Sequence, residues 1–424
     1  MLRLPLQALL AVVLLGCAGE APEAPPEPGV WTQAELRQLK SLRLDATPRP
    51  DPSNRLADDP AAADLGQELF YDAALSPSGT VSCVTCHDPS KGFADGKPRA
   101  EGIGTTARHA PVIPGSQYGA WLFWDGRADS LWAQAQGPIE HPDEMASSRT
   151  HVAQVVTTRH KARYEALFGP APDLSDSERF PPFARPDADP DTPAAQAWAA
   201  MSDADRDAVM QVFVNALKSI AAYERELVPT EAPFDRYVDA VAGGDASGGG
   251  ALTDAQVRGL STFLREGNCT ACHNGPMLTD RAFHNLGLPL AGVYDAGRSV
   301  GAAQVLRSEF SCRSRWSDTT DCPELDYLDP AFPDFQQAFK TPTLRNVAQT
   351  APYMHHGALA DLDAVITFYS ELPGDPAANH RELTLQPLHF TPEQRADLIA
   401  FLGALSGAPL SADLVGPPAS DPAP

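Results

Sequence analysis

The chain has 424 residues, of which 55 are acidic and 32 are lysine or arginine, so its formal net charge at neutral pH is −23. A chain this acidic repels the phosphate backbone, which argues against nucleic acid as a partner and favours a basic or locally basic protein. The length suffices for two domains, each with its own hydrophobic core.

The first residues have the pattern of a lipoprotein signal. Arg3 is followed by an apolar run over 4–15, and Leu14-Leu15-Gly16-Cys17 forms a lipobox. The apolar run is shorter than the roughly 20 residues of a spanning helix. We therefore expect a signal peptide over 1–16, a lipid on the Cys17 thiol as the only membrane contact, and a flexible tether over 17–30. An ordinary signal peptide with a soluble product is the alternative.

Apolar residues at helical spacing predict helices along much of the chain. The predicted helices cover 32–42, 64–71, 130–136, 149–168, 203–227, 253–266, 359–371 and 392–406. Alternating strand patterns are scarce, and the 41 prolines lie mostly in long connectors. The sequence therefore predicts an all-α protein with long ordered loops.

A glycine-rich stretch over 242–250 is the clearest predicted linker. It separates a first domain over 31–241 from a second over 251–410, which is followed by a flexible tail over 411–424. Each half contains one Cys-x-x-Cys-His unit that follows a predicted helix, so the halves look like an internal repeat.

The seven cysteines fall into three groups. Cys17 belongs to the lipobox, and four others form the two units Cys83-Val84-Thr85-Cys86-His87 and Cys269-Thr270-Ala271-Cys272-His273. Cys312 and Cys322 are left, and in an oxidising compartment we expect them to form a structural disulfide.

Each Cys-x-x-Cys-His unit suits covalent attachment of a haem. The two thiols can form thioethers with the vinyl groups, and the histidine that follows, His87 or His273, can ligate the iron. Zinc is an alternative ligand for four cysteines, but zinc would not need a histidine directly after each pair. The sequence therefore predicts two c-type haems in two cytochrome-c-like domains.

Further motifs accompany the haem units between about Leu65 and Ser406. They are Phe123-Trp124-Asp125-Gly126-Arg127, Gln134, Gly137-Pro138, Glu144-Met145, Lys340-Thr341-Pro342-Thr343-Leu344-Arg345-Asn346-Val347 and Ala351-Pro352-Tyr353-Met354-His355. In this order they resemble the bacterial di-haem cytochrome c peroxidase and MauG family. The resemblance implies an enzyme that acts on hydrogen peroxide.

The resemblance also implies roles around the first haem, where members of the family bind peroxide. A glutamate at the position of Glu144 moves a proton between the two peroxide oxygens, and a dry pocket that raises its pKa suits this role. Gln134 and Pro138 are expected to shape the same pocket. Trp124 resembles the tryptophan that passes electrons between the haems. Judged without the family, Glu144 would be a solvated loop acid and Trp124 a core residue.

Two positions depart from the ordinary peroxidases of the family. Glu101 stands where they have a loop histidine that ligates the first iron, which implies an open first iron, and the nearby His109 is expected to be structural. Tyr369 stands fourteen residues after His355, where they have a methionine that ligates the second iron. MauG-type enzymes use a tyrosine there, and tyrosine is a known haem ligand. Tyr369 as a buried aromatic residue is the alternative.

These departures imply that the haems share the two oxidising equivalents of peroxide in a bis-Fe(IV)-like state that oxidises a residue of a partner protein. Tyr369, the lipobox and the insertion around Cys312 and Cys322 resemble MauG relatives associated with methanobactin-type copper clusters. That resemblance implies conversion of tryptophan to kynurenine in a small copper-binding protein. A peroxidase that takes electrons from a small cytochrome c or cupredoxin, and a non-enzymatic electron carrier, are the alternatives.

The family also implies a calcium ion between the domains, bound mainly by backbone oxygens and water at positions that match His109, Thr350 and Pro352. His284 is expected to be a satisfied structural histidine. The leader and the haems imply a periplasmic location, with the lipid on Cys17 holding the protein to a membrane, by expectation the outer membrane of a Gram-negative bacterium.

Overall fold

The computed structural model describes residues 27–45, 47–288, 294–373 and 381–418. Over these ranges the protein is mainly helical, with one small antiparallel sheet in which Phe283–His284 (β1) pairs with Phe339–Lys340 (β2). The all-α prediction is confirmed. None of the helices in these ranges combines the length and the apolar character needed to cross a bilayer. The lipobox and Cys17 lie outside the described residues.

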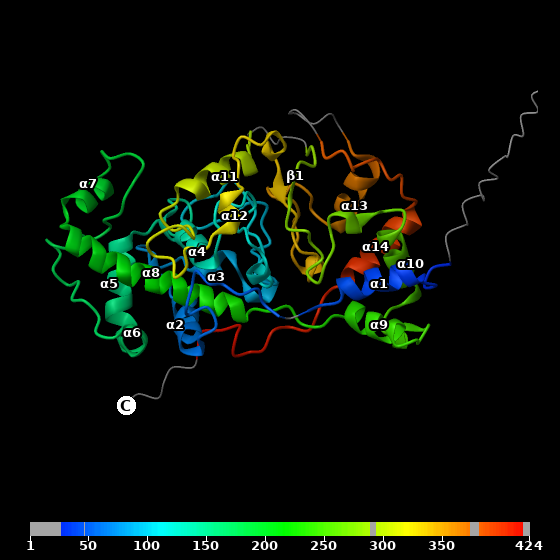
Figure 1. The fold of residues 1–424 in the computed structure, drawn as a ribbon, viewed down its shortest axis with the longest axis horizontal. Helices are drawn as coiled ribbons and strands as arrows, with labels where there is room; N and C mark the ends of the chain where they lie inside the picture. Colours follow the sequence, from blue (N-terminus) through cyan, green and yellow to red (C-terminus); the bar gives the residue numbers. More distant parts are fainter. Residues whose placement is uncertain (1–26, 46, 289–293, 374–380, 419–424) are drawn as a thin grey trace, which may run out of the picture.

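The helices gather into two groups along the long axis (Figure 1). The group around the first haem motif contains α2 (Pro60–Tyr71), α3 (Cys83–Cys86), α4 (Leu131–Glu140), α5 (Arg149–Arg159), α6 (Lys161–Phe168), α7 (Pro193–Ala200) and α8 (Asp203–Glu226). The group around the second motif contains α1 (Gln33–Leu42), α9 (Pro233–Ala242), α10 (Asp254–Leu264), α13 (Leu362–Glu371) and α14 (Pro392–Gly403).

Shorter helices complete the chain. Two of them, α11 (Arg298–Arg307) and the one-turn α12 (Pro323–Asp326), cover the first group, α11 at its top and α12 in front of α4 in the view of Figure 1. The 3-10 turns are η1 (Ala73–Leu75), η2 (Pro89–Lys91), η3 (Ser116–Tyr118), η4 (Gly248–Gly250), η5 (Cys269–Ala271), η6 (Pro333–Phe335) and η7 (Val347–Gln349).

Each group is built on one close helix pair that contains a glycine. A Cβ on Gly66 of α2 would lie 1.9 Å from the backbone oxygen of Ser219 in α8. A Cβ on Gly259 of α10 would lie 1.9 Å from the backbone oxygen of Asp397 in α14. Only glycine allows two helices to approach this closely. Both haem motifs follow the glycine-bearing helix, which supports the internal repeat.

The eight predicted ranges correspond to nine helices in the structure, and five helices do not have a predicted counterpart: α3, α7, α9, α11 and α12. The predicted helix 149–168 is two helices, because the chain leaves helical geometry at His160 (φ −109°, ψ 18°) between α5 and α6. The helix predicted from residue 64 starts at Pro60, where Asp59 caps two N–H groups.

The two hydrophobic cores do not divide the chain at the predicted boundaries. The first core runs from Leu65 to Leu227, whereas α1 and α9 contribute their apolar faces to the second core, together with α10 and α14. The predicted linker 242–250 includes η4, which packs on α9. Both α1 and α9 fall inside the predicted first domain, so the packing differs from the sequence division there.

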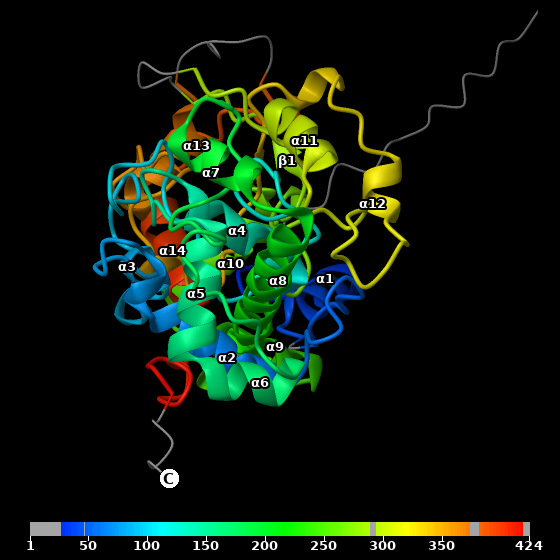
Figure 2. The ribbon, with the colours of Figure 1, turned by 90° about the vertical axis from the view of Figure 1, so that its left-hand side faces the viewer.

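The described part of the predicted tail returns to the first core. Gln67 donates to the backbone oxygens of Asp413 and Gly416, at 2.6 and 2.7 Å, and Tyr223 donates to that of Leu414. Residues 411–416 therefore form a strap across α2 and α8, which Figure 1 shows beneath these helices. The view along the long axis shows α5 and α8 side by side at the end of the molecule (Figure 2).

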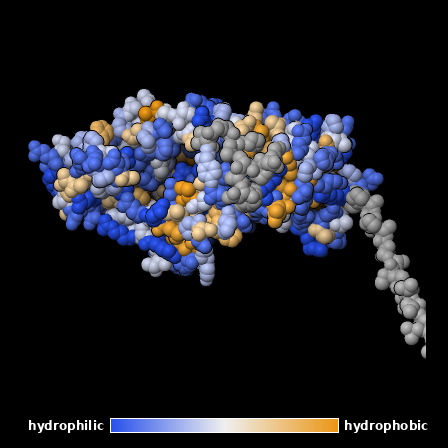
Figure 3. Space-filling view, turned by 90° about the horizontal axis from the view of Figure 1, so that it is seen from above, coloured by the Kyte–Doolittle hydropathy of each residue, from blue (hydrophilic) through white to orange (hydrophobic). Residues whose placement is uncertain are grey.

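The many charged residues of the sequence lead us to expect a largely hydrophilic surface. Seen from above, most of this face is hydrophilic, and hydrophobic residues gather in patches near the middle of the long axis (Figure 3).

Candidate active site

The first Cys-x-x-Cys-His unit forms α3, with Ser82 at its N-cap. Cys83 and Cys86 are not joined to each other, and burial raises the pKa of both thiols, that of Cys86 to about 11. Nδ1 of His87 lies 3.2 Å from the backbone oxygen of Phe93, and burial lowers the imidazole pKa. The ring is therefore neutral, and with Nδ1 donating to a carbonyl, Nε2 is free to ligate a metal.

The second unit repeats these features on η5. Burial raises the pKa of Cys269 to about 12, and Cys269 and Cys272 are not disulfide-bonded. Nδ1 of His273 lies 2.9 Å from the backbone oxygen of Leu278, and burial lowers its pKa. Each unit thus offers two thiols that are not joined in a disulfide and one neutral imidazole. This donor set fits a covalently attached haem with His87 or His273 as the iron ligand.

Glu144 lies in a turn that folds back on the end of α4. The turn is fixed by Met145, which donates to the backbone oxygen of Pro138 at 3.1 Å, and by Ser147, which donates to that of Ile139 at 2.9 Å. Burial raises the pKa of Glu144, while His141, 3.7 Å away, acts in the opposite direction. A half-buried carboxyl that resists ionisation can both accept and return a proton near neutral pH.

The carboxyl of Glu144 faces the first motif. Burial is the main reason for the raised pKa of the Cys83 and Cys86 thiols, and the charge of Glu144 raises both further. Pro138 lies inside α4 and holds the Glu144 turn through its carbonyl oxygen, and Gln134 lies one helical turn earlier. Positions four residues apart share one face of a helix. Gln134 therefore lies on the same face of α4 as Pro138, whose backbone oxygen holds the turn that carries Glu144.

The Phe-Trp-Asp-Gly-Arg motif closes the same region. A Cβ on Gly137 of α4 would lie 2.8 Å from the ring of Phe123, and the guanidinium of Arg127 lies 3.5 Å from the centre of that ring. The charge of Arg127 also acts on Glu144, in the direction that lowers its pKa. The motif thus brings the positive charge of Arg127 close to Glu144.

Trp124 connects the two halves of the chain. Its indole N–H donates to the backbone oxygen of His109 at 2.9 Å, and its own backbone oxygen accepts from Lys340 of β2 at 2.8 Å. The backbone N–H of His109 in turn donates to the oxygen of His355. The half-buried indole therefore lies where segments of both halves meet, which is the position that a relay between two haems requires.

Glu101 and His109 occupy the loop after the first motif. The Glu101 side chain is exposed and pairs with Lys97 at 2.5 Å, while its backbone oxygen lies 3.7 Å from the Sγ atom of Cys86. His109 is buried, and its Nδ1 lies 2.7 Å from the backbone oxygen of Lys97. Glu101 thus presents a carboxylate engaged with lysine, and His109 has the bonded, buried environment of a structural residue.

Tyr369 lies near the end of α13 and faces the second motif. Burial raises the pKa of its phenol, and the neighbouring Cys269 and Cys272 raise it further. Without a cation the phenol is therefore neutral, and a phenolate would form only where a positive centre such as iron offsets the burial. The structure thus brings the one tyrosine of α13 close to the two cysteines of the second motif.

His284 is held between two carboxylates, as expected for a satisfied histidine. Its ring nitrogens lie 2.8 Å from Asp280 and 2.8 Å from Glu382. The hydrogen bond with Asp280, followed by contacts with Cys272 and Glu382, raises the pKa of His284 to about 11. His160 in the first half has the same arrangement, with Glu68 and Asp72 at 3.0 and 2.9 Å.

Neither histidine clamp is evident from the sequence. The four-residue spacing of Asp280 and His284 is the one local signal for the second clamp, because Glu382 lies 98 residues away. His160 lies 92 and 88 residues from its two partners. The second clamp lies close to Cys272 of the second haem motif, whereas the first joins His160 to the end of α2.

The residues expected to hold calcium lie in two adjoining segments. His109 is joined to the segment of Thr350 and Pro352 through its hydrogen bond with His355. The backbone oxygen of His109 accepts from Trp124, and the Thr350 hydroxyl donates to the backbone oxygen of Val347 at 3.2 Å. The structure thus brings the two segments together.

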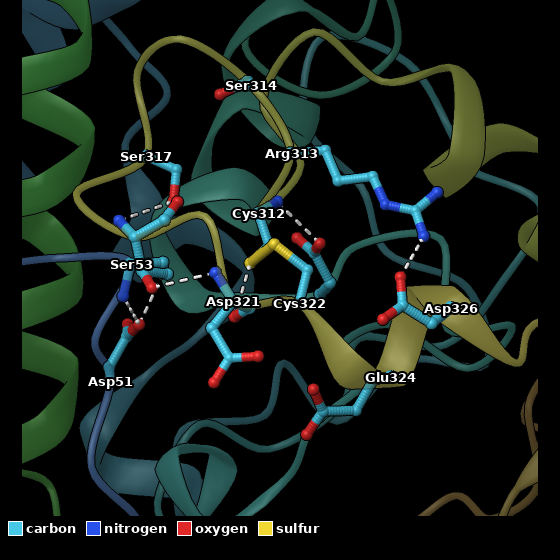
Figure 4. The surroundings of a disulfide bond; sticks show 12 residues. Asp51, Ser53, Cys312, Arg313, Ser314, Ser317, Asp321, Cys322, Glu324 and Asp326 are labelled. Atoms are coloured by element: carbon cyan, nitrogen blue, oxygen red, sulfur yellow. Dashed lines mark hydrogen bonds and ion pairs between the residues drawn. A yellow bond between two sulfur atoms is a disulfide. The ribbon is translucent and has the colours of Figure 1, made fainter.

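Cys312 and Cys322 form a disulfide, with 5.8 Å between their Cα atoms (Figure 4). The backbone N–H of Cys312 donates to Asp129 at 2.7 Å, two residues after the Phe-Trp-Asp-Gly-Arg motif. Cys322, Leu325 and Val305 form a small core that also contacts Trp121. The disulfide therefore fixes an insertion against the motif that carries Trp124.

Comparison with known proteins identifies the relatives of this chain. The family model of di-haem cytochrome c peroxidase matches residues 60–242. The methylamine utilization protein MauG of Methylorubrum extorquens is 32% identical over 422 residues, which cover 97% of this chain and 98% of that protein. The cytochrome-c peroxidase IdrP2 of Denitromonas iodatirespirans is 32% identical and covers 82% of each chain.

A solved structure supports the same assignment. The crystal structure of a MauG-like protein associated with microbial copper homeostasis shares 25% identity with a TM-score of 0.59, over 87% of this chain and 97% of that chain. The two haem-binding units, the helical fold and these similarities agree. The chain therefore belongs to the di-haem cytochrome c peroxidase and MauG family of c-type oxidoreductases that act with peroxide.

Proposed function

We propose that this protein is a MauG-type enzyme that uses hydrogen peroxide to oxidise a side chain of a partner protein. The observation that carries the proposal is Tyr369, whose phenol faces Cys269 and Cys272 at the second motif. A phenolate ligand lowers the reduction potential of a haem and favours its oxidised forms, whereas methionine raises that potential. Glu101, in place of a ligating histidine, supports an open first iron.

The bound haems would supply a two-electron oxidising centre. Glu144 would take the proton from the inner oxygen of peroxide and return it to the leaving oxygen, which departs as water. Its raised pKa fits this double role because the proton must be both accepted and released. Gln134 and Pro138 would limit the space around peroxide, and Trp124 would carry electrons between the two halves.

The partner is proposed to be a small periplasmic copper-binding protein in which a tryptophan becomes kynurenine. The similarity to the MauG-like protein associated with copper homeostasis supports this class of partner. The net charge of −23 suits a partner with a basic docking face. We also propose a periplasmic location with a lipid on Cys17 and an outer-membrane anchor, which the lipobox supports.

A calcium ion is proposed between the two halves, bound by backbone oxygens near His109, Thr350 and Pro352. The contact between their two segments supports this, since a site built from carbonyls needs both. Metal analysis of the purified holoprotein would find about one calcium per chain. Protein without calcium that keeps its haem spectrum and peroxide reaction would contradict the proposal.

A conventional peroxidase is the second candidate, favoured by the buried acid Glu144 beside the first motif. It would turn over peroxide with a reduced small cytochrome c or cupredoxin as electron donor. A purely electron-carrying role would need neither Glu144 nor an open first iron. Peroxide turnover with such donors would select the conventional peroxidase. Oxidation of a co-purified partner protein would select the MauG-type enzyme, and no reaction with peroxide would leave the electron carrier.

The deciding experiment is the optical and EPR spectrum of the resting diferric protein before and after one equivalent of peroxide, in wild type and Tyr369→Phe. We expect one high-spin and one low-spin haem, and a long-lived near-infrared band that the variant lacks. Two low-spin haems that ignore peroxide until one is reduced, and that the substitution leaves unchanged, would contradict the MauG-type function and support the conventional peroxidase or the carrier.

A further inference from the structure

All but one of the tryptophans in this chain have a cation stacked on the indole. The chain has six tryptophans, and all lie in the described ranges. The distances from cation to ring centre are 5.3 Å for Arg265 on Trp31, 4.1 Å for Arg298 on Trp121, 5.4 Å for Lys218 on Trp132, 5.6 Å for Arg149 on Trp198 and 4.3 Å for Arg315 on Trp316. Among the described residues, no lysine or arginine stacks in this way on Trp124.

A cation over an indole face changes how easily the ring loses an electron. The neutral ring attracts the cation through its quadrupole, whereas a ring that has lost an electron is itself positive and is repelled by it. One-electron oxidation of a tryptophan under such a cation is therefore less favourable than that of a bare one. The effect is strongest where the cation is buried and lacks a neutralising carboxylate.

Arg298 on Trp121 is buried and, among the described residues, forms no ion pair with a carboxylate, although the charge of Asp125 acts on it. The Arg298 side chain is 1% exposed and donates to the backbone oxygens of Asp125 and Gly126. Burial lowers its pKa only to about 10, so the group stays charged at neutral pH. Lys340 adds a second cation, because its ammonium donates to the backbone oxygen of Trp121 at 3.1 Å.

The other four cations also pair with carboxylates, which weakens their field at the ring. Arg265 pairs with Glu35, Lys218 with Asp318, Arg149 with Glu140 and Glu309, and Arg315 with Asp207. The structure therefore ranks Trp121 as the tryptophan most strongly disfavoured for oxidation, although it stands only three residues from Trp124.

We infer that these stacked cations disfavour one-electron oxidation of the five tryptophans beneath them, and most strongly that of Trp121, relative to that of Trp124. The inference rests on the proposed function, which generates the oxidant. The electron leaves an indole and passes to the oxidised haem pair.

Protection of Trp121 would keep oxidation away from the disulfide-bonded insertion. Trp121 packs against the small core that contains Cys312 and Cys322. If Trp121 lost an electron, the oxidised indole would lie beside the disulfide of the insertion. When a trapped indole reacts further, it loses two electrons in total, gains one oxygen atom from water and releases two protons. One peroxide takes up those two electrons and two protons and forms two waters.

The first test maps oxidation in the wild-type holoprotein with both haems bound. The protein receives excess hydrogen peroxide without a reductant, and peptide mass spectrometry measures oxygen gain at each of the six tryptophans. We expect Trp124 to be oxidised about tenfold more than any other. An equal or greater yield at Trp198 or Trp316, or no oxidation at Trp124 after the haem absorption has changed, would overturn the inference.

The second test changes the cation. Arg298→Met removes the charge at similar length, and we expect oxidation of Trp121 to rise about tenfold; Arg298→Lys keeps the charge and should keep Trp121 protected. Equal oxidation of Trp121 in both variants would overturn the inference. If peroxide leaves the haem absorption of wild type unchanged, the proposed function fails, and this inference fails with it.

A surface pair serves if Arg298→Met does not bind both haems. Arg315→Gln removes the cation from Trp316, whereas Arg313→Gln removes an exposed arginine that instead reaches Asp326 at 2.6 Å (Figure 4). We expect more oxidation of Trp316 in the first variant only. The same yield in both variants would overturn the inference for this site, and the wild-type map remains the deciding measurement.

Discussion

The two haem motifs share one support and differ in what faces them. In both halves a helix with a buried glycine leads into the motif, and the motif histidine has its Nδ1 at a backbone oxygen. Across the first motif lies Glu144, and across the second lies Tyr369. One chain thus holds two similar haem-binding frames and varies the group opposite each. In the proposed function the frame would hold the haem and the opposing side chain would determine its chemistry.

The two opposing side chains differ in their proposed roles: Glu144 would transfer a proton, and Tyr369 would ligate the iron. Burial raises the pKa of both Glu144 and Tyr369. For a carboxyl this moves the pKa up toward neutral pH, where proton exchange is useful. For a phenol it moves the pKa further from neutral pH, so the group ionises only if a metal replaces the proton. The same physical effect therefore suits one residue to acid-base work and the other to metal binding.

The largest expected effect comes from removing the proton-transfer group of the first site. Glu144→Gln keeps the shape but cannot accept a proton, so the second-order rate constant of the peroxide reaction should fall by about 10² to 10⁴. Stopped-flow absorption of the haem measures it. Asp143→Asn is the matched control and should retain the rate at neutral pH, and a similar loss in both variants would show that Glu144 has no special role.

The pH profile sharpens this comparison. Glu144 must be ionised to take the proton, so the rate should fall as the pH decreases through its pKa, which lies above the ordinary value of 4.5. The charge of Asp143 contributes to that raised pKa. Asp143→Asn should therefore shift the fall in rate to lower pH, and an unshifted profile would assign the titration to another group.

The next effect concerns the second site. Tyr369→Met replaces an anionic ligand with a thioether and should raise the reduction potential of the second haem by on the order of 100 mV. Spectroelectrochemical titration of the holoprotein resolves it. Tyr353→Phe, which removes a phenol that donates to the backbone oxygen of Val347, is the control. An unchanged potential in Tyr369→Met would mean that Tyr369 does not ligate the iron.

The smallest effects concern the two histidine clamps. His284→Gln should lower the free energy of unfolding at pH 7 by about 2 kcal/mol, because a charge-assisted pair is lost. Since the pKa of His284 is raised to about 11, its contribution is full below the unfolded value near 6.5 and is lost as the pH rises through 11. The difference from wild type in denaturant titrations should narrow over that range.

His160→Gln should also lower the free energy of unfolding at pH 7, by a smaller amount of about 1 kcal/mol. Burial lowers the pKa of His160, and the hydrogen bonds with Glu68 and Asp72 more than offset this. Its contribution is likewise lost at high pH. A difference from wild type that widens as the pH rises, for either variant, would show that the histidine is neutral in the folded protein.

Much of this picture is encoded in short local patterns. The haem units and the helical periods are visible because each depends on residues within a few positions of one another. The fold class, the family and its action on peroxide follow from them. Glu144, Gln134, Pro138 and Tyr369 were predicted through the order of motifs; Glu144 lies near the thiols of the first motif and Tyr369 near those of the second, while the roles of all four stay predictions.

Other features depend on contacts that no local pattern records. Periodicity shows that α1 and α9 each have an apolar face, but not that this face packs in the second core. The strap over 411–416 is held by backbone oxygens, which every sequence provides. The cations on the tryptophans come from positions far along the chain, such as Arg298 for Trp121.

Because of α1 and the strap, the chain alternates between the two hydrophobic cores. The chain builds part of the second core with α1, then the first core, then returns to the second, and finally crosses back to the first at residues 411–416. No single cut yields two complete halves, and a cut in 242–250 leaves each half missing a piece. The haem sites resemble duplicated modules, yet neither can be excised, shuffled or inherited as one contiguous gene segment.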